Sequence, residues 1–378
     1  MIDMGRPVQT ACMALALTMA CMPWRLLEAA PACAANRIHW GMNFHLPPEL
    51  WDKMPAILAP RGFTRIRVGI GGKDLVYLKR LRALLTGMSS RHIKAEAIIF
   101  NAYAKDYPKS KLCSTDLAEV EQESYSGAVQ SVAQTQDLIQ DFEMLNEVPL
   151  YPGIQVPGSN GQNAEDFDTP CGRMQAANLR GMSRAIADER KRTGRPLRII
   201  LGTVGRDFGF YKFMLAQGAN FDVAGYHIYP HEKHKTLDMD PWFGPGGPLV
   251  QLAKFNKPVS INEFNCGETY EPDFENQPEQ PKTEACYRGF AKHMKAIVNQ
   301  QVANIESIFL YELVDEPGKK PPENRFGLMS DLSTPKVTLL LASAFAGGAL
   351  TKAETAEITR RNLLTPQEIA AWAGCRAP

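Results

Sequence analysis

The sequence predicts a single (β/α)₈ barrel, and three observations support this fold class. Short apolar runs typical of buried strands alternate with helical segments from residue 38 to about residue 350. The strand-then-helix unit occurs eight times, as a closed parallel barrel requires. Loops after five of the strands are long, roughly 15–25 residues, as substrate-binding loops on one barrel face are. An open doubly wound sheet is the alternative, but no G-x-G-x-x-G motif follows the first strand.

The first half of the predicted barrel has four strands, at residues 37–44, 63–70, 93–100 and 142–146. The second of these carries β-branched residues at alternating positions, which favours a strand. Helices are expected at residues 48–59, 74–86, 116–140 and 173–193. In residues 74–86 leucines recur at helical spacing. The helix at 116–140 begins with a capping box of Asp116 and Glu119, and the helix at 173–193 ends at Gly194.

The second half has strands at residues 197–204, 221–228, 259–264 and 305–313, with helices at 208–217, 248–255 and 284–300. Thr334 and Pro335 fit the N-cap and first position of a last barrel helix. After residue 350, Thr365 and Glu368 fit a capping box that opens one further helix. We expect residues 36–350 to form the barrel and residues 351–378 to pack on it as a helical tail.

Composition and charge exclude several classes of protein. The chain has 378 residues, of which 44% are hydrophobic and 22% charged, as in an ordinary globular protein. A formal charge of +1 gives no reason to expect nucleic acid or an anionic membrane as a partner. No later apolar stretch is long enough to span a bilayer. We expect a monomer that uses no cofactor.

The first 35 residues differ from the rest of the chain. Residues 11–22 are apolar and are flanked by Arg6 and Arg25, and residues 32–34 fit a small-x-small cleavage site. This pattern predicts that residues 1–35 are a signal peptide and that the protein is secreted or periplasmic. An amphipathic N-terminal extension is the alternative.

Cysteine positions agree with export. The five cysteines after the leader are an odd number, so at least one is unpaired. Cys113 and Cys171 lie in loops after neighbouring strands, and Cys266 and Cys286 bracket the loop after the seventh strand. We expect both pairs to be disulfides, as in an oxidising compartment, and Cys375 to be free. Buried free thiols are the alternative, and no C-x-x-C spacing indicates zinc.

Two carboxylates carry most of the functional information. Glu147 and Glu263 each stand at or near the end of a predicted strand. Carboxylates at the carboxyl ends of different barrel strands converge on one cleft. Such a pair can hydrolyse a glycosidic bond, with one carboxylate as acid/base and the other as nucleophile. A structural ion pair at the barrel rim is the alternative.

The order of motifs resembles that of clan A glycoside hydrolases, closest to families 39 and 5. In this clan the fourth strand ends in Asn-Glu, here Asn146 and Glu147, and the seventh ends in the nucleophilic glutamate, here Glu263. The sixth commonly carries His-x-Tyr, matched by residues 227–229, and Arg67 matches an arginine near the end of the second. Residues 324–336 are similar to the segment after the eighth strand. Family 39 members usually carry an extra β-sandwich, and this chain has no segment long enough for one.

The chemistry assigns a separate task to each of these residues. Glu263 must be ionised to attack the anomeric carbon, and Glu147 must first be protonated. We expect the Arg67 charge and a Tyr229 hydrogen bond to hold Glu263, and a more apolar setting to raise the pKa of Glu147. Asn146 can donate to the sugar 2-hydroxyl.

Further sugar contacts are expected from residues at other strand ends and loops. The clan often has a tryptophan where this chain has Tyr311, which can stack on sugar or pack in the core. Glu312 is expected to form an ion pair or to face outward. His227, His231 and His234 have no helical i, i+4 frame, so no metal site is predicted. The candidate substrate-binding residues are Arg67, Asn146, His227, Tyr229, Tyr311, Asn43, His45, Asn101 and Trp242, with Tyr103 beside Asn101.

The sequence therefore predicts a secreted retaining glycosidase that cleaves β-linked poly- or oligosaccharides. Long loops on the catalytic face favour an open groove and endo action. Transglycosylation by the same residues is one alternative. A carbohydrate-binding barrel without activity is the other, and it predicts a missing catalytic carboxylate, whereas Glu147 and Glu263 are both present.

Overall fold

The computed structural model describes residues 38–71, 74–105, 107–235, 237 and 240–373. The expected signal peptide of residues 1–35 and the expected free thiol of Cys375 lie outside this part of the chain. Within it, no helix is both long and apolar enough to cross a membrane.

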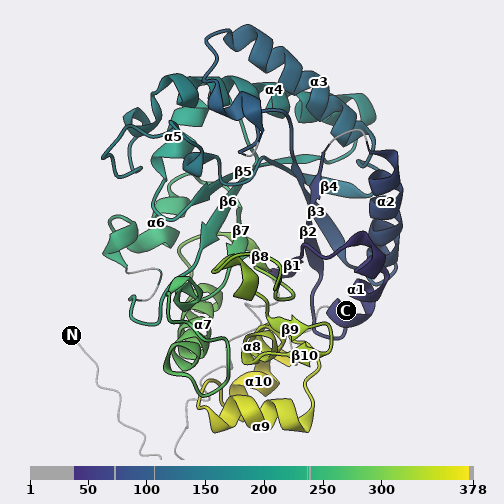
Figure 1. Cartoon of the computed structure of the whole chain (residues 1–378), viewed down its shortest axis with the longest axis vertical. Helices are drawn as coiled ribbons and strands as arrows, with labels where there is room; N and C mark the ends of the chain where they lie inside the picture. The colour runs from purple at the N-terminus through teal and green to yellow at the C-terminus, as the bar shows by residue number, and fades with distance from the viewer. Residues whose placement is uncertain (1–37, 72–73, 106, 236, 238–239, 374–378) are drawn as a thin grey trace, which may run out of the picture. The chain divides into compact units, whose positions relative to one another are not determined.

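Eight parallel strands close into a barrel in the order of the chain, as the sequence predicts (Figure 1). Strand β8 pairs back with β1, with Trp40 opposite Ile308, and this pairing closes the sheet. Buried residues dominate every strand, as expected for parallel strands covered on both faces. The strands are β1 (His39–Asn43), β2 (Arg65–Ile70), β3 (Lys94–Ile99), β4 (Ile139–Met144), β5 (Arg198–Val204), β6 (Val223–Ile228), β7 (Val259–Phe264) and β8 (Ile305–Leu310).

Helices surround the barrel and connect its strands (Figure 1). They pack on it through large apolar side chains; Phe264 of β7 meets Phe290 of α7 edge-on, with ring centroids 5.3 Å apart. Burial of such a side chain stabilises the fold by roughly 1.5–3 kcal/mol. The helices that follow the strands are α1 (Met54–Leu58), α2 (Leu75–Ser89), α3 (Leu117–Ala133), α4 (Pro170–Thr193), α5 (Gly209–Ala216), α6 (Gly247–Ala253), α7 (Pro281–Asn299) and α8 (Val337–Phe345).

The helix predicted at residues 116–140 is too long. Helix α3 ends at Ala133, and β4 begins at Ile139 rather than at residue 142. The polar start of β4 concealed the strand, because Asp141 interrupts the apolar run. The Asp141 carboxylate is buried and accepts hydrogen bonds from Arg65 at 3.2 Å and Arg198 at 2.6 Å. Neighbouring strands thus satisfy a charge that local sequence cannot explain.

The helix start predicted at Thr334 and Pro335 is also wrong. These residues form β10 (Thr334–Pro335), which pairs antiparallel with β9 (Met329–Asp331), and α8 begins only at Val337. The Asp331 carboxylate closes the turn by accepting from the Ser333 amide at 2.7 Å and the Thr334 hydroxyl at 3.0 Å. A side chain that completes a turn in this way competes with helix formation.

The tail after residue 350 holds two helices where the sequence predicted one. Helix α10 (Pro366–Ala373) follows the expected Thr365 cap, but α9 (Lys352–Arg360) was missed. The same signal could have found it, since Thr351 and Glu354 form a capping box. Trp372 of α10 packs against Phe345 of α8, with ring centroids 4.3 Å apart.

Both predicted disulfides are present. Cys113–Cys171 joins the loop after β3 to the first turn of α4, and Cys266–Cys286 joins the loop after β7 to α7. Each bond ties a long loop on the carboxyl side of the barrel to a helix of the outer layer.

Candidate active site

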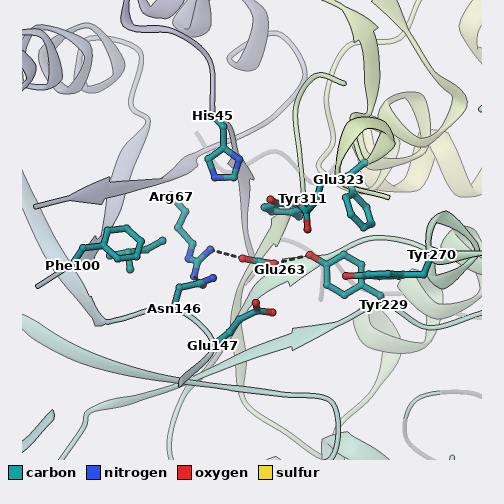
Figure 2. A pocket seen from close by; sticks show the side chains of 12 residues that line it. His45, Arg67, Phe100, Asn146, Glu147, Tyr229, Glu263, Tyr270, Tyr311 and Glu323 are labelled. Carbon is teal, nitrogen blue, oxygen red and sulfur yellow. Dashed lines mark hydrogen bonds and ion pairs between the residues drawn. The ribbon is translucent and has the colours of Figure 1, made fainter. Parts of the chain in front are cut away.

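Two glutamates from β4 and β7 face each other at the carboxyl end of the barrel (Figure 2). Glu263 lies within β7, and Glu147 follows β4 by three residues with a left-handed φ of 49°. Strained φ values of this kind occur often at functional sites. Ligand atoms of Glu147, Glu263 and His227 lie within 4.8 Å of one another. The barrel thus brings the two predicted carboxylates together.

Glu263 is the more enclosed of the two carboxylates, with 5% of the residue exposed. Its Oε1 accepts a hydrogen bond from Arg67 Nη1 at 2.9 Å, and its Oε2 accepts from the Tyr229 hydroxyl at 2.6 Å (Figure 2). Each oxygen of the carboxyl group is thus held by its own donor. Arg67 and Tyr229 therefore hold Glu263 as predicted.

Glu147 is more open, with 24% of its side chain exposed, and its Oε1 lies 3.3 Å from His227 Nδ1. Burial raises the pKa of this carboxyl, but the hydrogen bond and charge of His227, aided by Lys105 and Arg67, outweigh burial and leave the pKa below its usual value. The expected apolar setting that would raise the pKa of Glu147 is thus not found. The sequence could not show this, because β6 supplies the histidine.

His227 stands between the carboxylates and Arg67. Burial lowers its pKa, but Glu263 and the hydrogen bond with Glu147 raise it more, so the pKa lies above its usual value. Arg67 Nη2 lies 3.4 Å from His227 Nε2 and can only donate, which places the ring proton on Nδ1. From Nδ1 the proton faces Glu147 at 3.3 Å and Glu263 at 3.4 Å.

Arg67 is the centre of a wider network. Its Nε donates to Glu143 at 2.7 Å, and its Nη1 also donates to Asn43 at 3.0 Å. Its Nη2 donates to the Asn146 side-chain oxygen at 2.7 Å. The guanidinium is buried and meets partners from β1, β4 and β7, so its orientation is fixed from several sides.

Two cavities meet at Glu147. The first cavity has a volume of about 110 Å³, contains Glu263, and is lined by His45, Arg67, Ile98, Phe100, Asn146, Glu147, Tyr229, Glu263, Tyr270, Tyr311, Glu323 and Phe326. The second cavity is larger, at about 440 Å³, and is lined by Glu147, Leu150, Val204, Gly205, His227, Ile228, Tyr229, His231, Lys233, His234, Trp242, Phe243 and Tyr270. Glu147, Tyr229 and Tyr270 line both, so a long ligand can cross from one to the other.

The remaining candidates divide into three groups. His45 and Tyr311 line the first cavity, and Trp242 lines the second with 55% of its surface exposed. Asn43 lines neither cavity, since its side chain binds Arg67 and the Asn262 carbonyl. Asn101 is also occupied by protein, because its amide donates to Asn178 at 2.7 Å.

The residues beside these candidates are likewise occupied by protein partners. Tyr103 donates its hydroxyl to Glu123 at 2.6 Å. Glu312 forms the expected ion pair, with His45 at 2.9 Å, and is buried rather than facing outward.

Sequence reasoning missed several residues of the site. Phe100, Tyr270, Glu323 and Phe326 line the first cavity. Tyr270, Glu323 and Phe326 lie in loops after β7 and β8, where no strand end marks them. Phe100 stands at the end of the strand predicted at residues 93–100, so that signal could have found it. Glu143 was also missed, although a carboxylate inside an apolar strand signals a buried partner.

Two clusters in the described part of the chain have metal-ligand types: Glu147 with His227 and Glu263, and His45 with Glu312 and Glu316. A cationic side chain contacts each cluster: Arg67 binds Glu263, and Lys319 binds Glu316 at 2.6 Å. Nearby cationic side chains thus offset the carboxylate charge that would attract a metal ion.

Comparisons with known proteins identify the fold but no sequence family. No family model and no curated protein matches the chain. A family 39 glycoside hydrolase from Bacteroides cellulosilyticus matches with a TM-score of 0.54 and 17% identity, over 82% of this chain and 64% of that chain. A family 1 β-glucosidase from Thermotoga maritima matches with a TM-score of 0.56 and 13% identity, over 87% of this chain and 98% of that chain. A virulence factor from Agrobacterium tumefaciens matches with a TM-score of 0.56 and 14% identity, over 84% of this chain and 99% of that chain.

The chain therefore spans about two thirds of the length of the family 39 structure and nearly all of the other two. At these identities the similarity establishes the shared barrel. The protein has the (β/α)₈ barrel fold of solved family 39 and family 1 glycoside hydrolases.

Proposed function

We propose that the protein is a retaining glycoside hydrolase that cleaves β-glycosidic bonds of a polysaccharide or oligosaccharide. The observation that carries the proposal is the approach of Glu147 and Glu263, whose oxygens lie within 4.8 Å. Retaining enzymes hold their carboxyl groups about 5–5.5 Å apart, whereas inverting enzymes need about 6.5–9.5 Å to admit water. The shared fold with solved β-glycosidases supports the same reaction class.

Glu263 is the nucleophile in this proposal and Glu147 the acid/base. Glu263 attacks the anomeric carbon while the bond from that carbon to the leaving oxygen breaks and Glu147 protonates the oxygen. Glu147 then removes a proton from water, the water oxygen attacks the same carbon, and Glu263 leaves as a carboxylate. Arg67 and Tyr229 hold the two oxygens of Glu263 in place between turnovers.

Substrate binding prepares Glu147 for its first step. In the free protein His227 favours the ionised form of Glu147. A sugar that covers the exposed 24% of this side chain removes its remaining water, which favours the neutral acid. The proton comes from solvent, which reaches the exposed 24% of the Glu147 side chain before the sugar covers it.

The two cavities support sugar binding on both sides of the cleaved bond. The first cavity holds the sugar that reacts with Glu263, with Asn146 available to its 2-hydroxyl and His45 and Tyr311 around it. The second cavity receives the leaving part of the chain beside Trp242. A site open in both directions favours endo action, and the two disulfides favour a secreted or periplasmic protein.

The test is hydrolysis of a panel of aryl β-glycosides and β-linked polysaccharides, with the Glu147→Gln/Glu263→Gln double variant as background. Proton NMR of the first product should show the β anomer. An α anomer would exclude retention, and equal rates for the wild type and double variant on every substrate would exclude a glycosidase. Excess acceptor sugar in a parallel reaction measures transglycosylation by mass spectrometry.

A further inference from the structure

Two more carboxylates lie beneath Glu263, inside the barrel. Glu143 of β4 has no exposed surface and Glu96 of β3 has 3%. Arg67 Nε lies 2.7 Å from Glu143 Oε2 and 3.7 Å from Glu96 Oε1. One guanidinium therefore serves three buried carboxylates. Burial of unpaired charge is costly, so this cluster requires an explanation.

The two lower carboxyls have different surroundings. Burial raises the pKa of Glu96 well above its usual value, and the charge of Glu143 adds to this. Asn262 donates to Glu96 at 2.8 Å, and Ser260 lies 3.4 Å from it. Glu143 instead makes a direct charge-assisted hydrogen bond to Arg67 at 2.7 Å. Glu143 is thus the carboxyl group of this lower layer that Arg67 binds directly.

The Glu143 carboxylate fits beside β5 because the residue next to it is a glycine. Gly202 of β5 stands beside it, where a Cβ atom would lie only 2.8 Å from Glu143 Oε1. Among the described residues this oxygen has no hydrogen-bond partner. Other groups that face Glu143 are His227 Nε2 at 3.9 Å and the buried phenol of Tyr211.

We propose that Glu143 is a positioning residue for the nucleophile: it holds the Nε edge of Arg67, aims the other two nitrogens at Glu263 and Asn146, and keeps part of the arginine charge away from Glu263. The inference rests on the proposed role of Glu263. It follows from the fork shape of a guanidinium, in which fixing one edge fixes the direction of the others. A nucleophile that shares its cation stays more basic than one that has the cation alone.

The groups that face Glu263 are Arg67 at 2.9 Å, Tyr229 at 2.6 Å, His227 at 3.4 Å and Glu147 within 4.8 Å. Tyr270 and Tyr311 line the same cavity. Among the described residues Arg67 is hydrogen-bonded to both Glu263 and Glu143. His227 also lies between them, at 3.4 Å from Glu263 and 3.9 Å from Glu143. Replacement of Glu143 by glutamine should therefore act on Glu263 through Arg67, leaving the whole arginine charge for Glu263.

The experiment compares Glu143→Gln with Glu96→Gln, two isosteric changes on adjacent strands. Carbon-13 NMR of labelled glutamate carboxyls follows the Glu263 titration, with Glu263→Gln assigning the signal. In Glu143→Gln the Glu263 midpoint should fall by about one pH unit or more. In Glu96→Gln it should move by less than half of that shift, because Glu96 lies 3.7 Å from Arg67, beyond hydrogen-bond distance. Circular dichroism confirms that each variant is folded.

Kinetics supply the second readout. Glu143→Gln should lower kcat at neutral pH about tenfold or more with little change in KM. The acid limb of its pH–rate profile should move to lower pH by the same amount as the NMR midpoint of Glu263. An unchanged Glu263 midpoint in folded Glu143→Gln, or equal shifts in both variants, would overturn the inference. If Glu143→Gln does not fold, Gly202→Ala displaces the carboxylate instead, and the same midpoint shift decides the matter.

The two proposals fail in different ways. The NMR titration needs no substrate, so it tests the link between Glu143 and Glu263 even if the wild type hydrolyses nothing. If the wild type hydrolysed no substrate of the panel, this would contradict the proposed function alone. A normal wild type with an unmoved midpoint in Glu143→Gln would contradict the positioning role alone.

Discussion

Arg67 Nη1 and Glu263 Oε1 lie 2.9 Å apart, and this ion pair joins β2 to β7 across the inside of the barrel. The two strands are not neighbours in the sheet, so no backbone pairing holds these residues together. The pair is nearly inaccessible to solvent, with side-chain exposures of 2% and 7%. Its geometry therefore depends on the polar partners around Arg67, which makes the arginine a suitable first target.

Replacement of Arg67 by methionine should destabilise the protein strongly. The change leaves Glu143 and Glu263 as buried carboxylates without their cation, which costs about 3–5 kcal/mol of unfolding free energy. Urea unfolding at pH 7 measures the loss. The loss should shrink near pH 4, where the carboxyls can take up protons. Arg67→Lys is the matched control and should be milder, because it keeps the charge but loses the fork. A methionine variant as stable as the wild type would contradict the network.

Reduction of the disulfides should affect the loops that carry the site. Cys266–Cys286 closes a loop over a sequence separation of 20 residues and Cys113–Cys171 over 58. Opening either bond by a Cys→Ser pair should lower stability by roughly 2–4 kcal/mol. Non-reducing peptide mapping tests the pairing first, and a cross-link from Cys375 to any of the four would contradict it. Urea unfolding of each double variant then gives the stability change.

The fold could be predicted because each strand is a short apolar run followed by a helix, and that pattern is local. The boundaries that failed depend on distant partners. Asp141 hid the start of β4 because its cations come from β2 and β5. The same limit applies to the site, where strand ends revealed Glu147 and Glu263. The pKa of Glu147 depends on His227 from β6, whose contact with Glu147 no local pattern could reveal.

Glu312 should make stability depend on pH. Burial raises its pKa to about 7, against the opposing effect of His45, from an ordinary value of 4.5. As pH rises from 4.5 to 7 the unfolded chain releases this proton while the folded protein keeps it, so the folded state loses stability. The loss amounts to at most about 3 kcal/mol. His45, whose pKa is raised, acts in the same direction above its ordinary value of 6.5.

Glu312→Gln should remove this dependence, because glutamine has no proton to release. Unfolding free energies at pH 5 and pH 8 should differ less in this variant than in the wild type. The exposed Glu165→Gln provides a matched control that should leave the wild-type difference in place. The prediction would be contradicted if the unfolding free energy of the wild type and that of Glu312→Gln changed by the same amount between pH 5 and pH 8.

His227→Asn should move the alkaline limb of the rate profile to higher pH. The imidazole lowers the pKa of Glu147, so its removal lets burial raise that pKa, and the acid stays protonated further into the alkaline range. The shift should be about one pH unit in kcat/KM for a substrate with a poor leaving group. His293→Asn is the control, since His293 is buried but lines neither cavity. A limb that does not move would show that His227 does not control the acid.

Glu263→Gln and Glu147→Gln should fail for different chemical reasons. Glu263→Gln removes the nucleophile, so no glycosyl-enzyme can form with any leaving group. Glu147→Gln removes only proton transfer, which contributes a factor of about 10²–10⁴. An activated aryl glycoside needs no protonation, so it should still form the intermediate in Glu147→Gln, and mass spectrometry of the intact protein should detect the added sugar.

Azide separates the two roles by the product it gives. It is a small nucleophile that needs no general base, so with Glu147→Gln it should attack the glycosyl-enzyme and yield a β-glycosyl azide. With Glu263→Ala, which removes the side chain, it can enter the space left within 4.8 Å of Glu147, attack the substrate directly and yield the α anomer. Proton NMR of the glycosyl azide distinguishes the anomers. The same anomer from both variants, or wild-type activity in either on a natural substrate, would show that the roles of Glu147 and Glu263 are assigned wrongly.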